Sequence, residues 1–230
     1  MAIDIQLRPG ERGLLVGQTG SGKTAGAIWQ IAHTAQRVII CDTKGEPAFD
    51  SFPIREEETR IQVATVADLK AALQDKRGAA YIILRPPPGA LADMALMDAY
   101  LECAYRYGQG WMVFIDELYQ WHSGGRAGPG LIGLLTRGRS KGTSTLMATQ
   151  RPSWVTRFAL TEATRYYVYR LIDQADRKRL GEVIEGFSDT LNPPPFHWWY
   201  SHNGDRAILM KPVPLLYPGG YVPEPKSRWI

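Results

Sequence analysis

The segment that most constrains the fold is a glycine-rich stretch near the N-terminus that matches the pattern G-x-x-x-x-G-K-[ST] at every position. It consists of Gly17, Gln18, Thr19, Gly20, Ser21, Gly22, Lys23 and Thr24. An apolar run at 13–16 precedes it, and a helical pattern at 23–34 follows it. A strand, a glycine-rich turn and a helix in this order form the context in which such a loop binds phosphate. The sequence therefore predicts a strand–loop–helix unit around a phosphate site.

Each residue type in this loop suits the binding of ATP. The glycines let the backbone curl so that its N–H groups point inward, and the helix N-terminus adds the positive end of its dipole. Lys23 supplies a positive charge for the β- and γ-phosphates, and the Thr24 hydroxyl can bind Mg²⁺. We therefore expect all eight residues to bind ATP, with Mg²⁺ as the accompanying metal.

A second apolar strand ends in two adjacent acidic residues, Asp116 and Glu117. A carboxylate at the C-terminal edge of a sheet, beside a phosphate-binding loop, can hold Mg²⁺, and this role is predicted for Asp116. The carboxylate of Glu117 can orient and deprotonate an attacking water. Such a pair separates hydrolysing motor ATPases from most small kinases and GTPases. The sequence therefore predicts ATP hydrolysis with Glu117 as the base.

A polar amide, Gln150, ends the next apolar strand. An amide at the C-terminal edge of a strand can sense the γ-phosphate or hold the attacking water, which is its predicted catalytic role. The alternative is a capping residue before the turn at Pro152.

Two arginines and a lysine precede that strand: Arg137, Arg139 and Lys141. Either arginine could act as an arginine finger on the ATP of a neighbouring subunit. The cluster could instead contact the phosphate backbone of DNA. The third interpretation is a solvated basic surface, and the sequence leaves all three open.

Short apolar runs alternate with helical patterns along most of the chain. The expected strands are at 13–16, 37–42, 79–84, 111–116, 143–149 and 164–172. The expected helices are at 23–34, 66–76, 90–107, 130–139 and 174–185. This alternation predicts an α/β fold with a mostly parallel sheet between helices.

The C-terminal part of the chain differs in character. Asn192 and the three prolines after it form a stiff break. Two short runs at 196–201 and 206–211 flank Asn203-Gly204, which predicts a β-hairpin. The stretch from Pro212 onward is expected to run extended, either as a strap over the domain or a neighbour, or as a loose tail. The predicted division is a core at 1–190 and a hairpin with a proline- and glycine-rich tail at 191–230.

Composition adds few further constraints. Of 230 residues, 44% are apolar, which suits a folded domain, and the two cysteines form no metal-binding pattern. The formal net charge of +4 is compatible with binding a polyanion or with a slightly basic enzyme. No secretory signal and no transmembrane segment are expected, so the predicted location is the cytoplasm of a host cell.

Two further segments make a family resemblance specific. The segment Asp42-Thr43-Lys44-Gly45-Glu46 is similar to the Asp-Pro-Lys-Gly-Glu segment of the FtsK–HerA superfamily of DNA-pumping ATPases. The segment Ala148-Thr149-Gln150-Arg151-Pro152 is similar to that superfamily's sensor strand and exit. The chain departs from the pattern at Thr43, where proline is typical.

The small size of the chain makes it resemble, within that superfamily, the genome-packaging ATPases of tailless icosahedral viruses with an internal membrane. The resemblance covers about residues 13–185. It implies a RecA-like P-loop NTPase core, a homo-oligomeric ring with six subunits as the expected number, and translocation of double-stranded DNA. The implied partners are proteins of the capsid vertex or of the viral membrane, which would place the chain at a packaging vertex of the virion.

A ring motor needs loops that face its channel. The glycine-rich loop that follows the acidic pair carries Trp121 and Arg126, and both are candidate DNA contacts together with Lys141. The alternative for this loop is a surface segment that closes over the nucleotide. Aromatic residues at 196–200 could stack on bases, or could pack a hairpin on the core or form an oligomer interface.

The leading hypothesis is therefore an ATP-driven translocase that packages double-stranded DNA into a preformed capsid. The nearest alternatives keep the motor and change its task to conjugation, plasmid mobilisation or filamentous-phage morphogenesis. A small-molecule phosphotransferase, with Arg137 and Arg139 as lid residues, is the alternative from another class.

Overall fold

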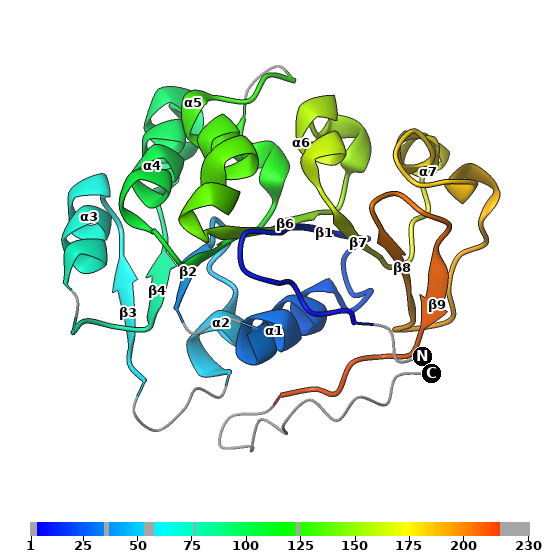
Figure 1. Cartoon of the computed structure of the whole chain (residues 1–230), viewed down its shortest axis with the longest axis horizontal. Coiled ribbons are helices and arrows are strands. Elements are labelled where there is room, and N and C mark those ends of the chain that lie inside the picture. The colour runs from blue at the N-terminus through cyan, green and yellow to red at the C-terminus, as the bar shows by residue number, and fades with distance from the viewer. Residues whose placement is uncertain (1–3, 35–36, 53–57, 76, 123–124, 217–230) are drawn as a thin grey trace.

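A nine-stranded sheet forms the centre of the computed structural model, which describes residues 4–34, 37–52, 58–75, 77–122 and 125–216 (Figure 1). The strands are β1 (Arg12–Val16), β2 (Val38–Cys41), β3 (Arg60–Val63), β4 (Tyr81–Leu84), β5 (Met112–Ile115), β6 (Ser144–Thr149), β7 (Arg165–Val168), β8 (Trp198–His202) and β9 (Ile208–Met210). Their order across the sheet is β3-β4-β2-β5-β6-β1-β7-β8-β9. The pairs from β3 to β7 are all parallel, whereas β8 and β9 join antiparallel.

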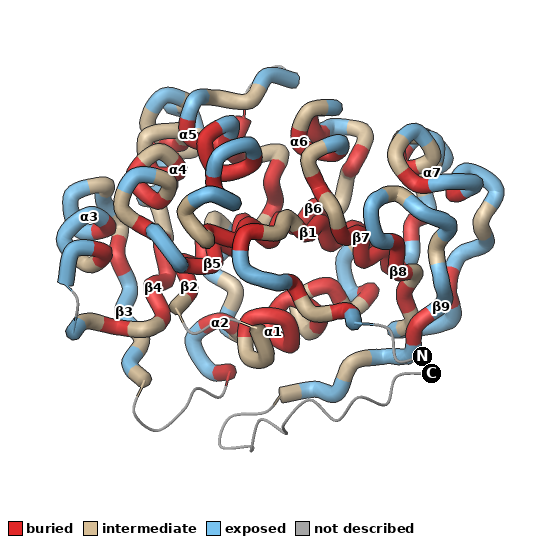
Figure 2. Tube along the Cα trace, viewed as in Figure 1, coloured by how far each residue is buried: buried red, intermediate tan, exposed pale blue. Residues whose placement is uncertain are grey.

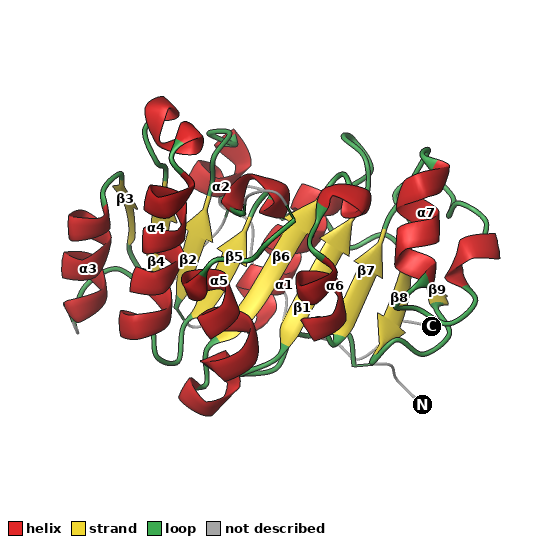
Figure 3. Cartoon of the chain, turned by 90° about the horizontal axis from the view of Figure 1, so that it is seen from above, coloured by secondary structure: helices red, strands yellow, loops and turns green. Residues whose placement is uncertain are grey.

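Parallel strands bring their C-terminal ends to one edge of the sheet, where ligand sites form in α/β folds. Figure 3 shows the arrowheads of β2, β5, β6, β1 and β7 pointing to that common edge. The residues that follow β1, β5 and β6 therefore lie near one another, although they are far apart in the sequence.

Helices cover both faces of this sheet. They are α1 (Lys23–Thr34), α2 (Pro47–Ser51), α3 (Val66–Gln74), α4 (Met94–Tyr107), α5 (Pro129–Ile132), α6 (Arg157–Glu162) and α7 (Gln174–Gly181). Figure 1 shows α1 and α2 on one face and α3, α4, α5 and α6 on the other. No described helix is long and apolar enough to span a membrane.

Because both faces are covered, the central strands are buried along their whole length (Figure 2). Successive residues of β1 pack into different apolar clusters: Leu14 and Val16 join one, and Leu15 joins the other. The predicted α/β fold with a mostly parallel sheet is confirmed.

Two predicted helices are interrupted. The helix expected at 90–107 begins as a 3-10 turn, Pro88–Ala92, and the α-helix starts only after Asp93. The Asp93 carboxylate accepts hydrogen bonds from the N–H groups of Ala95 and Leu96, which makes it an N-cap. The helix expected at 130–139 is α5 followed by a π-helical turn, Gly133–Arg137, and a 3-10 turn, Gly138–Lys141.

The edge strand β3 was not predicted from the sequence. Its central residues, Ile61 and Gln62, are exposed, so it lacks the apolar run that marked the buried strands. Pairing with β4 alone places it at the end of the sheet.

The predicted hairpin forms, and it extends the central sheet. Strand β8 pairs antiparallel with β7, with Val168 opposite Trp199, and β9 pairs with β8. Asn203 and Gly204 both have positive φ, of 52° and 80°, as a tight hairpin turn requires. Of the chain beyond Pro212, Val213 and Leu216 pack against the buried cluster on the α1 face, and 217–230 lies outside the described residues.

Candidate nucleotide-binding site

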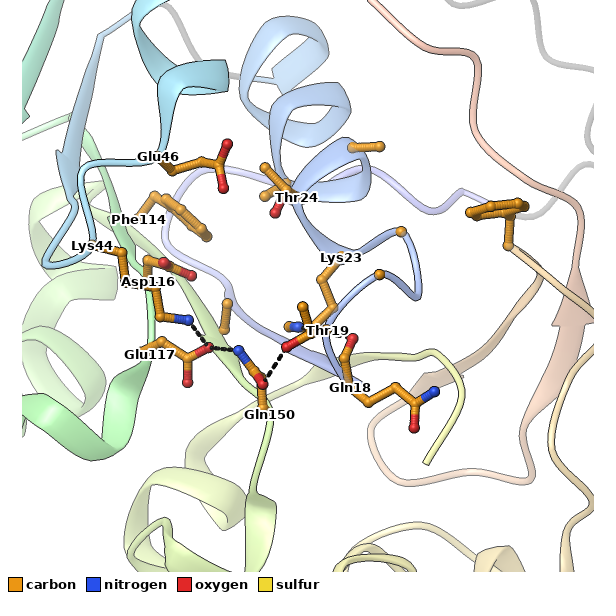
Figure 4. Close-up of a pocket in the computed structure, with 16 residues that line it drawn as sticks. Gln18, Thr19, Lys23, Thr24, Lys44, Glu46, Phe114, Asp116, Glu117 and Gln150 are labelled. Atoms are coloured by element: carbon orange, nitrogen blue, oxygen red, sulfur yellow. Dashed lines mark hydrogen bonds and ion pairs between the residues drawn. The ribbon is translucent and has the colours of Figure 1, made fainter. Parts of the chain in front are cut away.

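A pocket of about 420 Å³ opens at the C-terminal edge of the sheet (Figure 4). Its lining comes from the phosphate-binding loop (residues 17–24) and the start of α1, the segment after β2, the ends of β5 and β6, and the approach to β8. The residues are Gln18, Thr19, Gly20, Gly22, Lys23, Thr24, Ala25, Ala27, Lys44, Glu46, Phe114, Asp116, Glu117, Ala148, Gln150 and Phe196.

The phosphate-binding loop is tied to the strands on both sides of β1. The N–H of Gly17 donates to the carbonyl of Thr149 at 3.2 Å, and the N–H of Gln18 donates to the carbonyl of Arg170 at 3.0 Å. A Cβ on Gly17 would lie 2.6 Å from the Cβ of Tyr169, so only glycine fits there. The loop is therefore held in shape by its neighbours before any ligand binds.

Lys23 folds back over this loop. Its ammonium donates to the carbonyl of Gln18 at 3.4 Å, and the side chain is buried. Burial lowers the pKa of Lys23, and the nearby charges of Glu117 and Asp116 oppose that shift. A triphosphate in the pocket would supply the negative charge that this buried cation lacks at short range.

A chain of hydrogen bonds crosses the pocket from the loop to Glu117 (Figure 4). The Thr19 hydroxyl donates to Oε1 of Gln150 at 2.8 Å, and Nε2 of Gln150 donates to Oε1 of Glu117 at 2.7 Å. Nζ of Lys44 donates to the same oxygen of Glu117 at 2.5 Å. We call these four residues the Thr19–Lys44 chain. The structure thus brings the predicted catalytic residues Glu117 and Gln150 into direct contact.

Glu117 itself is held in an unusual state. It is 1% exposed, and within the described part of the chain its Oε2 atom has no hydrogen-bond partner. Its backbone φ of 50° lies in the left-handed region, which is uncommon for residues other than glycine, asparagine or aspartate. Such strain clusters at functional sites. The free oxygen can accept a proton or a hydrogen bond from a water that enters the pocket.

The segment after β2 is shaped by Asp42. The buried Asp42 carboxylate accepts hydrogen bonds from the N–H groups of Lys44, Gly45 and Glu46, at 3.1, 2.9 and 2.9 Å. Nε of Arg85 donates to the same carboxylate at 2.8 Å. The turn is therefore rigid, and it aims Lys44 at Glu117.

From the sequence, this segment indicated a family resemblance, and no role in the site was predicted for Lys44. Because Lys44 follows β2 closely and lies at the same edge of the sheet as Glu117, its position in the sequence could have predicted a role in the site. Thr43, the departure from the family pattern, makes a hydrogen bond through its hydroxyl to Oε1 of Gln120. This contact joins the turn to the segment that follows Glu117.

The oxygen-bearing side chains expected to hold a metal lie in the pocket. The Asp116 carboxylate and the Thr24 hydroxyl both line it. Burial raises the pKa of Asp116 to about 6, with Lys44 opposing and the charges of Glu117 and Asp42 adding to the shift. A divalent cation would reverse this penalty, so the donor set fits Mg²⁺ completed by phosphate oxygens and water.

Other predicted site residues lie elsewhere. Arg137 and Arg139 are exposed and belong to the turns before β6, at the opposite edge of the sheet. A Cβ built on Gly10, which precedes β1, would lie 3.1 Å from the Cα atom of Arg139. Neither side chain is therefore placed to reach the pocket of its own subunit.

The predicted DNA contacts are not brought together, and one prediction is wrong. Trp121 is 1% exposed, and its indole N–H donates to the carbonyl of Asp116 at 3.1 Å, so it is a core residue that supports the acidic pair. Lys141 is half-buried, and its ammonium donates to the carbonyl of Tyr105 and lies over that ring. Of these three residues, only Arg126 is exposed.

Comparisons with known proteins identify relatives of this chain. No protein-family model matches it. It is 29% identical over 217 residues to the DNA packaging ATPase P9 of Enterobacteria phage PRD1, with 89% of this chain and 88% of that protein covered.

Two solved structures show the fold. The genome packaging NTPase B204 from Sulfolobus turreted icosahedral virus 2, in complex with ATPγS, matches with a TM-score of 0.62 at 16% identity, covering 90% of this chain and 100% of that one. VirB4 of Thermoanaerobacter pseudethanolicus matches with a TM-score of 0.60 at 11% identity, covering 88% of this chain and 89% of that one. The RecA-like core and the resemblance to packaging ATPases of the FtsK–HerA type are confirmed.

Proposed function

We propose that this chain is the motor ATPase that drives double-stranded DNA into a preformed viral capsid. The observation that carries the proposal is the 29% identity to the DNA packaging ATPase of phage PRD1, which extends over nearly the whole of both chains. The chain is accordingly an ATPase, and the pocket at the C-terminal edge of the sheet contains the groups that ATP hydrolysis requires. The translocation of DNA is the part that experiment must establish.

In the proposed reaction the triphosphate lies along the phosphate-binding loop. The backbone N–H groups of the loop and the ammonium of Lys23 bind its oxygens, and their charge stabilises the negative charge that shifts to the leaving group. Bound Mg²⁺, held by Thr24 and Asp116, would neutralise phosphate charge. Glu117 orients the attacking water and accepts its proton.

The Thr19–Lys44 chain supports a link between the γ-phosphate and the base. Thr19 and Gln150 lie at the pocket wall, and both have oxygen or nitrogen atoms that a phosphate would compete for. A γ-phosphate that draws Lys44 or Gln150 toward itself would free Oε1 of Glu117. Glu117 would then act as a base only when ATP is in place.

Assembly is part of the proposal. Arg137 and Arg139 lie away from their own pocket and are exposed, which fits a finger that completes the ATP site of the next subunit. A closed homo-oligomeric ring, with six subunits as the expected number, would supply such a neighbour and would surround the DNA. Arg126 is the candidate for a contact to the phosphate backbone.

The motor would act where the capsid is filled. Its expected partners are proteins of the capsid vertex or of the viral membrane, and its expected location is the host cytoplasm or a packaging vertex of the virion. The structural likeness to VirB4 concerns the fold alone and does not distinguish between tasks. The alternative tasks for the same motor are conjugation, plasmid mobilisation and filamentous-phage morphogenesis.

The deciding experiment measures ATP turnover with and without double-stranded DNA, over a series of DNA lengths, with molar mass recorded under the same conditions. The proposal predicts turnover that rises with double-stranded DNA of sufficient length, together with a ring. Lys23→Ala is the control that should abolish ATP binding. Turnover that is equal with and without DNA, from a protein that stays monomeric, would refute it.

A further inference from the structure

An exposed aromatic residue, Phe196, borders the pocket at the end that no predicted catalytic residue occupies. It lines the pocket, and a Cβ built on Gly22 of the phosphate-binding loop would lie 3.7 Å from its Cδ1 atom. Phe196 is 60% exposed, whereas Trp198 and Tyr200, which follow it, are 2% and 4% exposed. Of the aromatic residues at 196–200, Trp198 and Tyr200 are core residues, Trp199 is partly buried against the opposite apolar cluster, and Phe196 is the one exposed at the pocket.

The backbone at Phe196 carries strain. The N–H of His197 donates to the carbonyl of Pro194 at 3.1 Å, which closes a four-residue turn with Pro195 in its second position. Phe196 occupies the third position with a φ of 61°. A turn of this kind with proline second normally has glycine or asparagine third, because φ is positive there. A large aromatic residue is disfavoured at this position, so stability of the turn does not explain it.

The sheet topology places Phe196 across the loop from the reacting groups. In the strand order, β5 and β6 lie on one side of β1, and β7 and β8 lie on the other. Glu117 and Gln150 follow β5 and β6, whereas Phe196 comes just before β8. Because β8 is antiparallel to β7, the chain enters β8 at the edge where β1 and β7 end. A triphosphate that lies on the loop with its γ-phosphate toward Glu117 has its nucleoside toward β8.

We infer that Phe196 is the platform on which the purine base of the bound nucleoside triphosphate stacks. This inference rests on the proposed function only in that the pocket binds a nucleoside triphosphate. Phe196 is exposed and can present a π-face to a base, whereas Trp198 and Tyr200 are buried in the core. Strain at this turn is then the consequence of presenting a ring at the pocket.

A single stacking ring favours purine over pyrimidine nucleotides, but it does not distinguish ATP from GTP. Among the described lining residues, Phe196 alone comes from the hairpin side of the pocket, and the polar side chains come from the loop, the Asp42–Glu46 turn, and the ends of β5 and β6. Every base has a π-face, so stacking does not read the hydrogen-bonding groups that distinguish adenine from guanine, and its strength follows the size of the ring. The inference therefore predicts that ATP and GTP are both accepted and that pyrimidine triphosphates, with a smaller ring, bind more weakly.

The test uses Phe196→Gly, because glycine suits the turn and removes the ring. We expect the KM for ATP to rise about tenfold while kcat at saturation and its stimulation by DNA persist, because stacking acts equally on ground and transition states. Binding of inorganic tripolyphosphate with Mg²⁺ should not change, and Tm should not fall. Phe196→Trp should retain the wild-type KM. Leu209→Ala, which removes an exposed apolar side chain of the same hairpin away from the pocket, is the matched control.

Three results would overturn the inference. One is an unchanged KM for ATP in Phe196→Gly. Another is an equal loss of affinity for ATP and tripolyphosphate, which would mean that the ring shapes the loop. The third is a change in assembly state with ATP affinity intact, which would assign the ring to a subunit interface. A wild-type protein that stays monomeric and hydrolyses ATP without response to DNA would refute the proposed motor and leave this comparison of KM values valid.

Discussion

Nζ of Lys44 lies 2.5 Å from Oε1 of Glu117, and this ion pair joins the turn after β2 to the residue after β5. The Glu117 side chain is 1% exposed and the Lys44 side chain is 40% exposed, so only the lysine is in contact with solvent. If Lys44 is removed, Glu117 becomes a buried carboxylate without a counter-charge at this distance, and among the described residues only Gln150 still donates a hydrogen bond to its Oε1 atom. The pair therefore stabilises the nucleotide-free protein.

Lys44→Ala should lower the free energy of unfolding by about 1–2 kcal/mol, which is the cost of breaking a buried pair discounted for the exposure of the lysine. In a Glu117→Gln background the same change should cost less, since the uncharged amide needs no counter-charge. Urea denaturation of the single and double variants measures this coupling, with Lys178→Ala on α7 as the surface control. Equal losses in both backgrounds would contradict the pairing.

Glu117→Gln should preserve ATP binding and reduce kcat by about 10²–10⁴-fold, the usual contribution of a general base. The amide can still accept the hydrogen bond from Lys44 but cannot take a proton from water. Single-turnover hydrolysis, with ATP affinity measured in parallel, separates the two effects. Glu102→Gln on α4 is the matched control, because that carboxylate pairs with Arg106 on the surface. Normal turnover in Glu117→Gln would remove it from this role.

The raised pKa of Asp116 predicts a pH dependence for metal binding. Its carboxyl group titrates at about 6, so its affinity for Mg²⁺ should fall as the pH drops below 6. Mg²⁺-dependent binding of ATP, titrated between pH 5 and 8, should show this loss, and Asp116→Asn should bind Mg²⁺ weakly at every pH. An Asn variant with the wild-type profile would show that another group titrates.

The same shift has a consequence for the stability of the nucleotide-free protein. The pKa of Asp116 is higher in the folded protein than its ordinary value of 3.8, so the folded state holds the proton more tightly. This contribution to stability is present below pH 3.8 and is lost as the pH rises through about 6. Relative to wild type, Asp116→Asn should therefore gain stability as the pH rises through this window, as measured by chemical denaturation.

Arg137→Ala or Arg139→Ala should inhibit wild-type protein when the two are mixed, if either arginine completes a neighbour's site. In a mixed ring each mutant subunit would leave one adjacent ATP without its finger, and the rate should fall faster than the fraction of wild type. Arg106→Ala, which changes an exposed arginine of α4, is the control and should leave the rate of the mixture unchanged. Proportional dilution by both finger variants would argue against a role in trans.

Much of the fold could be predicted because its signals are local. The bounds of α1 were predicted without error, and the buried strands were marked by continuous apolar runs. The exposed edge strand β3 was missed because pairing with β4, rather than its own residue pattern, makes it a strand. The long helix predicted at 90–107 was shortened by Asp93, whose side chain competes for backbone N–H groups.

The phosphate-binding loop could be predicted from local sequence, since its glycines, Lys23 and Thr24 act through eight consecutive residues and a helix N-terminus. The residues that surround the loop are brought there by the tertiary fold. Lys44 reaches Glu117 across 73 residues of sequence, Phe196 reaches the pocket only because β8 joins the sheet antiparallel, and Trp121 is buried beneath Asp116. These contacts depend on the order of strands in the sheet, which no local pattern encodes.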